Sequence, residues 1–193
     1  MAQTIVGLFD LVEQAQAGVH GLLNSGVPAE DISVVANGRP NARVVGQDLL
    51  PGDAVSAGAA TSGALGMLPG FGTLNLPGLG LVMVAGPLAA GIGWVLASTG
   101  AGAPAGGLIG ALVEAGVPDN NAHVYAQSIL RGGAIVVVTS DALLGDAVYD
   151  LLGRAGAVDP AARYAELRSS GWERFDPFVE RSSMAGEPDS LMY

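Results

Sequence analysis

The residues best suited to catalysis or metal binding are few and scattered. His20 and His123 lie far apart in the sequence and neither belongs to a ligand-spaced cluster, so structural histidines are the simpler interpretation. The chain has no cysteine to act as a nucleophile, disulfide partner or metal ligand. Two polar pairs, Glu30-Asp31 and Asp119-Asn120, each follow a Val-Pro dipeptide, where capping of a helix or turn accounts for them. We therefore expect no enzyme activity, no metal ion and no cofactor.

Nucleotide binding has weak support in a glycine-rich stretch. Gly78-Leu79-Gly80 matches the first half of a G-x-G-x-x-G loop, but Met83 stands where the third glycine is required. The G-K-S/T element of a P-loop is absent as well, because the chain has no lysine. Its 18 acidic and 8 basic residues give a net charge of −10, which opposes the phosphates of a nucleic acid. We expect no nucleic-acid partner.

The dominant feature of the sequence is residues 54–113, a run of sixty residues without a charged side chain. An ordinary globular domain carries about 25% charged residues, so chance does not explain this run. Small apolar residues dominate it, and its 20-residue piece 79–98 is long enough for a bilayer core of about 30 Å. Such a segment must be buried in lipid, in the protein's own fold or in an oligomer.

Similar strand and helix signals flank the uncharged run on both sides. Residues 4–9 and 32–36 read as strands, separated by a helix that starts at the capping-box spacing of Asp10 and Glu13. Residues 134–139 form a β-branched run typical of a strand buried on both faces. A capped helix follows that run, and residues 157–158 read as a short last strand.

These signals predict an α+β fold: a ferredoxin-like split β-α-β domain interrupted by a glycine-zipper α-helical hairpin. Residues 1–53 supply the N-terminal β-α-β half with a connector, and residues 116–160 supply the C-terminal α-β-α-β half. Residues 54–115 form the helical hairpin insert, which we expect to project from the sheet rather than join it. Residues 161–193 begin as a helix and continue as an extended polar tail.

Glycines at four-residue spacing indicate close helix packing within the insert. Glycine inside a helix costs about 1 kcal/mol relative to alanine, and close approach of two backbones compensates for that cost. The alternative is that part of residues 101–115 is a loop. The expected helix-packing or assembly residues are Gly102, Gly106, Gly110, Gly86 and Gly91.

Several longer stretches carry a family resemblance. They are VGLFD with LLNSGVPAEDISVV, then LPGLGLVMVAGPLAAGIG, then GGLIGALVEAGVPDNNAHVYAQSILRGGAIVVV, and finally SSGWERFD. In this order they resemble the bacterial general stress protein family typified by heat-induced stress proteins, over about residues 4–176. The resemblance implies β-α elements around a glycine-zipper hairpin and stress-linked expression, and it transfers no catalytic residue. The tail after Phe175 departs from the pattern.

Two functions from different classes fit these features. The first is a non-enzymatic general stress protein associated with the membrane through the hydrophobic hairpin, with Trp94 either an interfacial anchor or a core residue. The alternative is a soluble self-assembling scaffold or shell protein, a homo-oligomer in which the hairpins pack between copies. A small-ligand sensor built on the sheet is a third, weaker hypothesis.

The expected location follows from the N-terminus and the charge. Met1-Ala2-Gln3-Thr4 lacks the basic start and apolar core of a signal peptide, so we expect a cytoplasmic domain. In the first hypothesis that domain lies at the inner face of the cell membrane, with lipid as a partner. In the alternative it belongs to a soluble cytoplasmic assembly.

Overall fold

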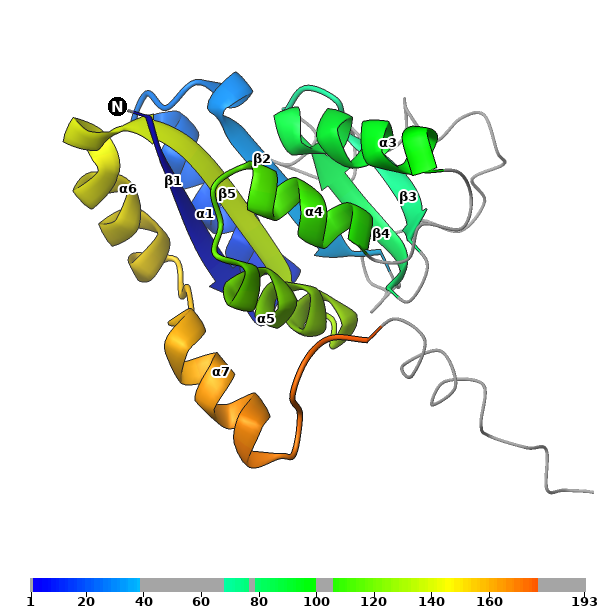
Figure 1. Cartoon of the computed structure of the whole chain (residues 1–193). Coiled ribbons are helices and arrows are strands. Elements are labelled where there is room, and N and C mark those ends of the chain that lie inside the picture. Colours follow the sequence, from blue (N-terminus) through cyan, green and yellow to red (C-terminus); the bar gives the residue numbers. More distant parts are fainter. Residues whose placement is uncertain (1, 39–67, 77–78, 100–105, 177–193) are drawn as a thin grey trace, which may run out of the picture.

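The computed structural model describes residues 2–38, 68–76, 79–99 and 106–176, which form a mixed α/β fold (Figure 1). Within them, a five-stranded antiparallel sheet has the order β1-β5-β2-β4-β3. The strands are β1 (Ala2–Phe9), β2 (Ile32–Asn37), β3 (Gly72–Leu76), β4 (Gly80–Ala85) and β5 (Ala134–Asp141). The helices are α1 (Val12–Asn24), α3 (Pro87–Thr99), α4 (Gly106–Glu114), α5 (Asp119–Leu130), α6 (Ala142–Arg154) and α7 (Pro160–Ser169), with a 3-10 turn at Ala29–Asp31.

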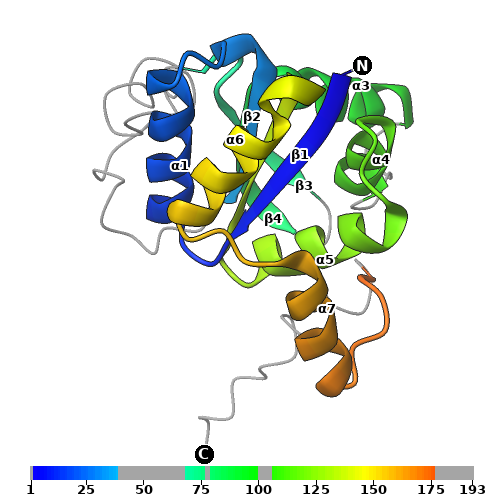
Figure 2. The same ribbon diagram turned by 90° about the vertical axis from the view of Figure 1, so that its left-hand side faces the viewer.

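Helices cover both faces of the sheet. Figures 1 and 2 show α1 and α6 on one face and α3, α4 and α5 on the other. Each face has its own buried cluster, the first containing Phe9, Val19 and Leu152 and the second containing Leu112 and Ile129. The resulting three layers place α3 and α4, which carry a single charged residue at Glu114, opposite α1 and α6.

The N-terminal and C-terminal parts of the chain share this sheet. β1 pairs with β5 along its whole length, with Ile5 opposite Val138, and β5 pairs on its other side with β2. The expectation that the two flanking parts form one sheet is therefore confirmed. The burial of β5 on both faces is confirmed too, because Val136 lies in one cluster and Ile135 in the other.

A short strand at residues 157–158 was also expected, and it is reduced to a single bridge. The Val158 amide donates to the Leu8 carbonyl oxygen at 2.7 Å in an antiparallel arrangement. Because Leu8 already pairs with Ile135 of β5, Val158 lies on the outer edge of β1. The spatial order across the sheet is thus Val158, β1, β5, β2, β4, β3.

The structure corrects the expectation that residues 54–115 form a helical hairpin outside the sheet. β3 and β4 lie within this range, form a β-hairpin, and add to the edge of β2 through pairs such as Val34 with Ala85. Side chains in β4 alternate, with Val82 and Val84 buried in the cluster that contains Leu108 and with Met83 packed against the opposite cluster. Because β4 contacts apolar groups on both faces, its sequence does not alternate between polar and apolar residues. The alternation that usually reveals a strand is therefore missing. The first part of this insert, residues 54–67, lies outside the described residues.

Two predicted helix caps are also wrong. Helix α1 begins at Val12 after Leu11, with no side-chain cap, and Asp10 instead forms an ion pair with Arg163 of α7. Helix α5 begins after Pro118, again without a side-chain cap, and Asp119 faces His123 and the C-terminal segment. Both carboxylates instead pair with arginines that come later in the chain, Asp10 with Arg163 and Asp119 with Arg174.

None of the helices in the described part of the chain is both long and apolar enough to cross a bilayer.

Candidate functional site

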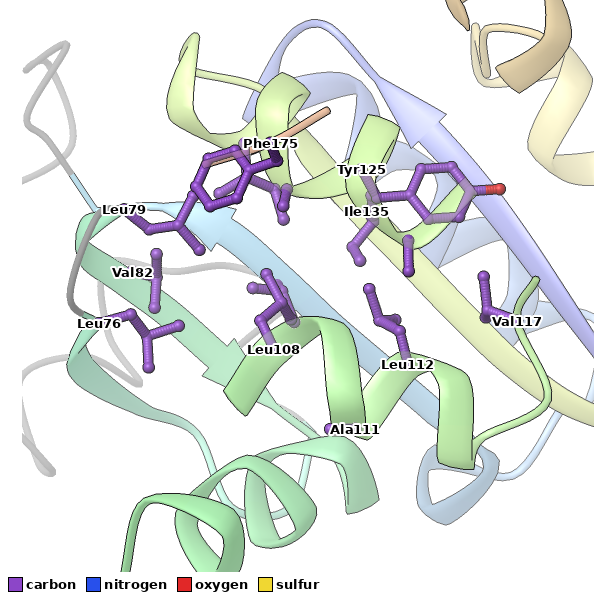
Figure 3. Close-up of a cluster of buried hydrophobic side chains, with 14 of the residues drawn as sticks. Leu76, Leu79, Val82, Leu108, Ala111, Leu112, Val117, Tyr125, Ile135 and Phe175 are labelled. Carbon is purple, nitrogen blue, oxygen red and sulfur yellow. The ribbon is translucent and has the colours of Figure 1, made fainter. Parts of the chain in front are cut away.

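Helices α3 and α4 pack against each other and against the sheet. Leu88 and Ile92 of α3 and Leu108 and Leu112 of α4 are buried on their inner sides. Figure 3 shows Leu108 and Leu112 in one cluster with Tyr125 of α5. The uncharged segment thus supplies much of the protein's own core on this face.

The contact between these two helices includes two small residues, Gly91 of α3 and Ala111 of α4. A β-carbon added at Gly91 would lie 3.9 Å from the Ala111 β-carbon, an ordinary van der Waals distance. The helices therefore meet through a glycine–alanine contact that still has room for one methyl group. Gly91 therefore lies at the contact between α3 and α4, and a role for it in assembly stays a prediction.

Gly110 points away from that interface. It is exposed, and a β-carbon added there would meet nothing within 4 Å. Val113, on the same helix, is 42% exposed, and Ala90 of α3 is exposed as well. We call these three exposed and uncharged residues the α3–α4 surface, which the exposed Glu114 borders one turn after Gly110.

Gly86 has a different role from the one expected of it. It precedes α3 with a φ of 82°, and an added β-carbon would lie 2.1 Å from the Ile32 carbonyl oxygen. Only glycine allows the chain to cross β2 so closely. Two residues later, the Leu88 amide donates to Ser33 Oγ at 3.1 Å, which fixes the start of α3 on β2. Gly86 is therefore a helix-to-strand packing residue.

The remaining candidate residues are only partly described. Gly102 lies outside the described residues, and Gly106 is the first residue of α4. Trp94 belongs to α3, but the surroundings of its side chain lie outside what the structure describes. The choice between an anchor and a core role for Trp94 therefore stays a prediction.

A second feature, which was not predicted from the sequence, joins the C-terminal segment to α5. We call residues 171–176 the clasp. Trp172 Nε1 donates to Gln127 Oε1 of α5 at 3.1 Å, and Phe175 is 3% exposed within the cluster beneath α4 (Figure 3). Tyr164 of α7 meets the Trp172 ring edge-on, with the centroids 6.4 Å apart. A polar tail was expected here, but the aromatic side chains of the clasp are part of the fold.

His123 of α5 is hydrogen-bonded to Arg174 of the clasp, and both side chains lie near the carboxylate of Asp119. Arg174 Nε donates to His123 Nε2 at 2.8 Å, and Arg174 Nη2 lies 3.3 Å from Asp119 Oδ2. Asp119 Oδ1 is 3.8 Å from the same histidine nitrogen. A guanidinium only donates hydrogen bonds, so Nε2 must accept and the ring is neutral, with its proton on Nδ1.

The environment of His123 favours this neutral form. Burial lowers the pKa of His123 below its usual value, and the positive charge of Arg174 lowers it further. Asp119 and the backbone of Phe175 act in the opposite direction without reversing the shift. His123 is thus a hydrogen-bond acceptor that loses this ability when it gains a proton.

The ionisable groups at this site take part in packing and hydrogen bonding between segments of the chain. Burial raises the pKa of Tyr125 to about 12, with the charge of Asp159 adding to the shift, so its hydroxyl stays protonated at neutral pH. Within the described residues, no group of three or more His, Cys, Asp or Glu side chains gathers as a metal site requires. The arrangement holds one segment of the chain on another.

Comparisons with known proteins add no relative: no family model, no curated protein and no solved structure matches this chain.

Proposed function

We propose that this chain is a non-enzymatic general stress protein that acts by associating with other copies of itself through the α3–α4 surface. One observation carries the proposal: Ala90, Gly110 and Val113 are exposed and uncharged in a protein with a net charge of −10. A face that meets only water normally carries charged side chains, whereas the centre of an interface is depleted of them. The stress assignment rests on the family resemblance of residues 4–176.

We further infer a ferredoxin-like core for the part of the chain that flanks the insert. The order Val158, β1, β5, β2 supports this inference, because each β-α-β connection then has one strand inserted between its two strands. Helices α1 and α6 lie together on one face of these strands, as that arrangement requires (Figure 2). The hairpin β3–β4 and helices α3 and α4 are then additions at the β2 edge.

The rigid attachment of α3 and α4 favours association without refolding. Their inner residues are held in the core, so the outer surface is already formed in the monomer. A stable interface of standard size buries about 800 Å² per partner. The net charge of −10 opposes any association of copies, and salt screens this repulsion over about 10 Å at 0.1 M. Assembly should therefore strengthen as salt is added.

Membrane association is the second candidate, and the same surface supports it. Val113 is 42% exposed on a helix that carries only one charged residue, Glu114 at its end. An uncharged helix face can lie in the interfacial region of a bilayer. The acidic protein would then prefer neutral to anionic lipid, because anionic headgroups repel it.

Size-exclusion chromatography with light scattering, at low and high salt, tests the proposal. We expect a mass above that of the 19.2 kDa monomer, increasing with protein concentration and with salt. Flotation with vesicles of phosphatidylcholine, alone or mixed with phosphatidylserine, tests the second candidate in parallel. A monomer at every salt concentration that floats with neutral vesicles would replace self-association by membrane association. A monomer that binds neither vesicle would refute both.

A further inference from the structure

We propose that the clasp, residues 171–176, is released from α5 when His123 gains a proton. The hydrogen bond from Arg174 Nε to His123 Nε2, at 2.8 Å, carries the proposal. Protonation turns Nε2 into a donor, and a guanidinium has no acceptor to offer it. The bond must then break, and two positive groups are left facing each other.

Asp119 determines which side chain moves away when His123 gains a proton. Its carboxylate is shared in the neutral state, with Oδ2 at 3.3 Å from Arg174 Nη2 and Oδ1 at 3.8 Å from His123 Nε2. A protonated His123 competes with Arg174 for this carboxylate from the adjacent turn of the same helix. Because His123 is 7% exposed whereas the Arg174 side chain is 66% exposed, Arg174 is the partner that leaves.

The other charged groups around α5 have partners or positions elsewhere. On α7, Arg163 pairs with Asp10 and Glu166, and Arg168 lies over the Tyr164 ring. Glu114 is exposed at the end of α4. The clasp also carries Glu173 and Asp176, both exposed carboxylates. The electrostatic influences on His123 come from Arg174 and Asp119, the two groups that the proposal uses.

Release has a structural consequence beyond the loss of one hydrogen bond. Trp172 and Phe175 flank Arg174 in the sequence, and both lie against α5 or the cluster around it. Detaching the clasp would expose apolar surface beneath Phe175. The open form would therefore present an apolar face only under acidic conditions, which goes beyond the self-association proposed above and uses a different surface.

The test follows Trp172 by fluorescence. The chain has two tryptophans, so Trp94→Phe leaves Trp172 as the single reporter. Acrylamide quenching is measured from about pH 7.5 to about pH 5, across the range in which a histidine titrates. Circular dichroism confirms that the protein stays folded at each pH. The open population is expected to rise by up to about tenfold per pH unit, the limit for a single proton.

The two histidines provide a matched pair of variants. His123→Gln keeps a hydrogen-bond acceptor but cannot take up a proton, so quenching should no longer depend on pH. His20, exposed on α1 with Nδ1 bonded to Asn24, is the control, and His20→Gln should keep the full pH response. A response that survives in His123→Gln, or is absent from the parent, would overturn the proposal.

A second variant decides the matter if His123→Gln does not fold. Arg174 is exposed, so Arg174→Met should leave the fold intact. It removes both the bond to His123 and the repulsion that follows protonation. We expect stronger quenching at pH 7.5 and a smaller increase on acidification than in the parent. A response of undiminished size in Arg174→Met would show that the clasp does not sense this histidine.

Discussion

Replacing Gly86 with alanine is the sharpest test of how the uncharged insert is attached to the sheet. Gly86 stands between β4 and α3 at a φ of 82°, and its added β-carbon would lie 2.1 Å from the Ile32 carbonyl oxygen and 2.7 Å from Ser33 Cα. Both contacts are with backbone atoms of β2, a buried strand, which cannot move aside without disturbing the sheet. If the insert projected freely from the domain, alanine at this position would incur only the cost of its left-handed conformation.

The expected loss has two parts. A left-handed conformation costs a residue with a β-carbon about 1–2 kcal/mol. Relieving the clash requires the chain to move away from β2, which weakens two hydrogen bonds worth about 1 kcal/mol each. These are from the Gly86 amide to the Pro69 carbonyl at 2.7 Å and from the Leu88 amide to Ser33 Oγ at 3.1 Å. The free energy of unfolding should fall by about 3–4 kcal/mol in total.

Gly26→Ala separates the two parts. Gly26 has a similar φ of 87°, but nothing lies within 4 Å of its added β-carbon. Its variant should lose only the conformational cost of about 1–2 kcal/mol. Urea unfolding followed by circular dichroism measures both variants against the parent. Equal losses for Gly86→Ala and Gly26→Ala would refute the close crossing of β2, and with it the attachment of α3 to the sheet.

Three further predictions concern stability. Asn37→Ala should lower the free energy of unfolding by about 1–3 kcal/mol, because the buried Asn37 Nδ2 donates to the Ile129 carbonyl at 2.7 Å; Asn37→Asp would test the lost donor separately. Gly153→Ala on the exposed side of α6 should raise it by about 1 kcal/mol in the same urea assay, since nothing crowds the added methyl group. Because burial lowers the pKa of His123, the unfolded chain takes up a proton before the folded one. The difference in free energy of unfolding between the parent and His123→Gln should be constant above pH 6.5, and the parent should become less stable relative to the variant as the pH falls below 6.5. A difference that does not change with pH would contradict the lowered pKa of His123.

The flanking strands could be predicted from the sequence because local signals and tertiary structure agree there. Residues 4–9, 32–36 and 134–139 are β-rich runs bounded by turns, and the matched strand–helix pattern correctly placed β1 and β5 in one sheet. The strand β4 was hidden because both of its faces contact apolar groups, which removes the alternation that reveals a strand, whereas β3 is only five residues long. Composition indicated burial of this segment but not the element that would achieve it.

The clasp could not be predicted because its contacts join residues far apart in the sequence. Arg174 and His123 are separated by 51 positions, and neither residue type alone indicates the other. The available signal was the pair of aromatics around Arg174 in a segment otherwise polar, which is unusual for an extended tail. In the uncharged run, small residues indicated helix packing, and only the structure distinguishes Gly91, which lies beside Ala111 of α4, from the exposed Gly110.

The central claim, self-association through the α3–α4 surface, is tested most directly by moving one negative charge between two glycines. Gly110 of α4 and Gly153 of α6 are both exposed helix residues with nothing within 4 Å of an added β-carbon, and they belong to helices on opposite faces of the sheet. Either change to glutamate keeps the fold and adds the same charge. A difference in particle mass, measured by light scattering at fixed protein and salt concentration, therefore depends only on where the charge is placed. We predict that Gly110→Glu reduces the particle to the monomer mass while Gly153→Glu retains the mass of the parent. Equal masses for the two variants would contradict the account.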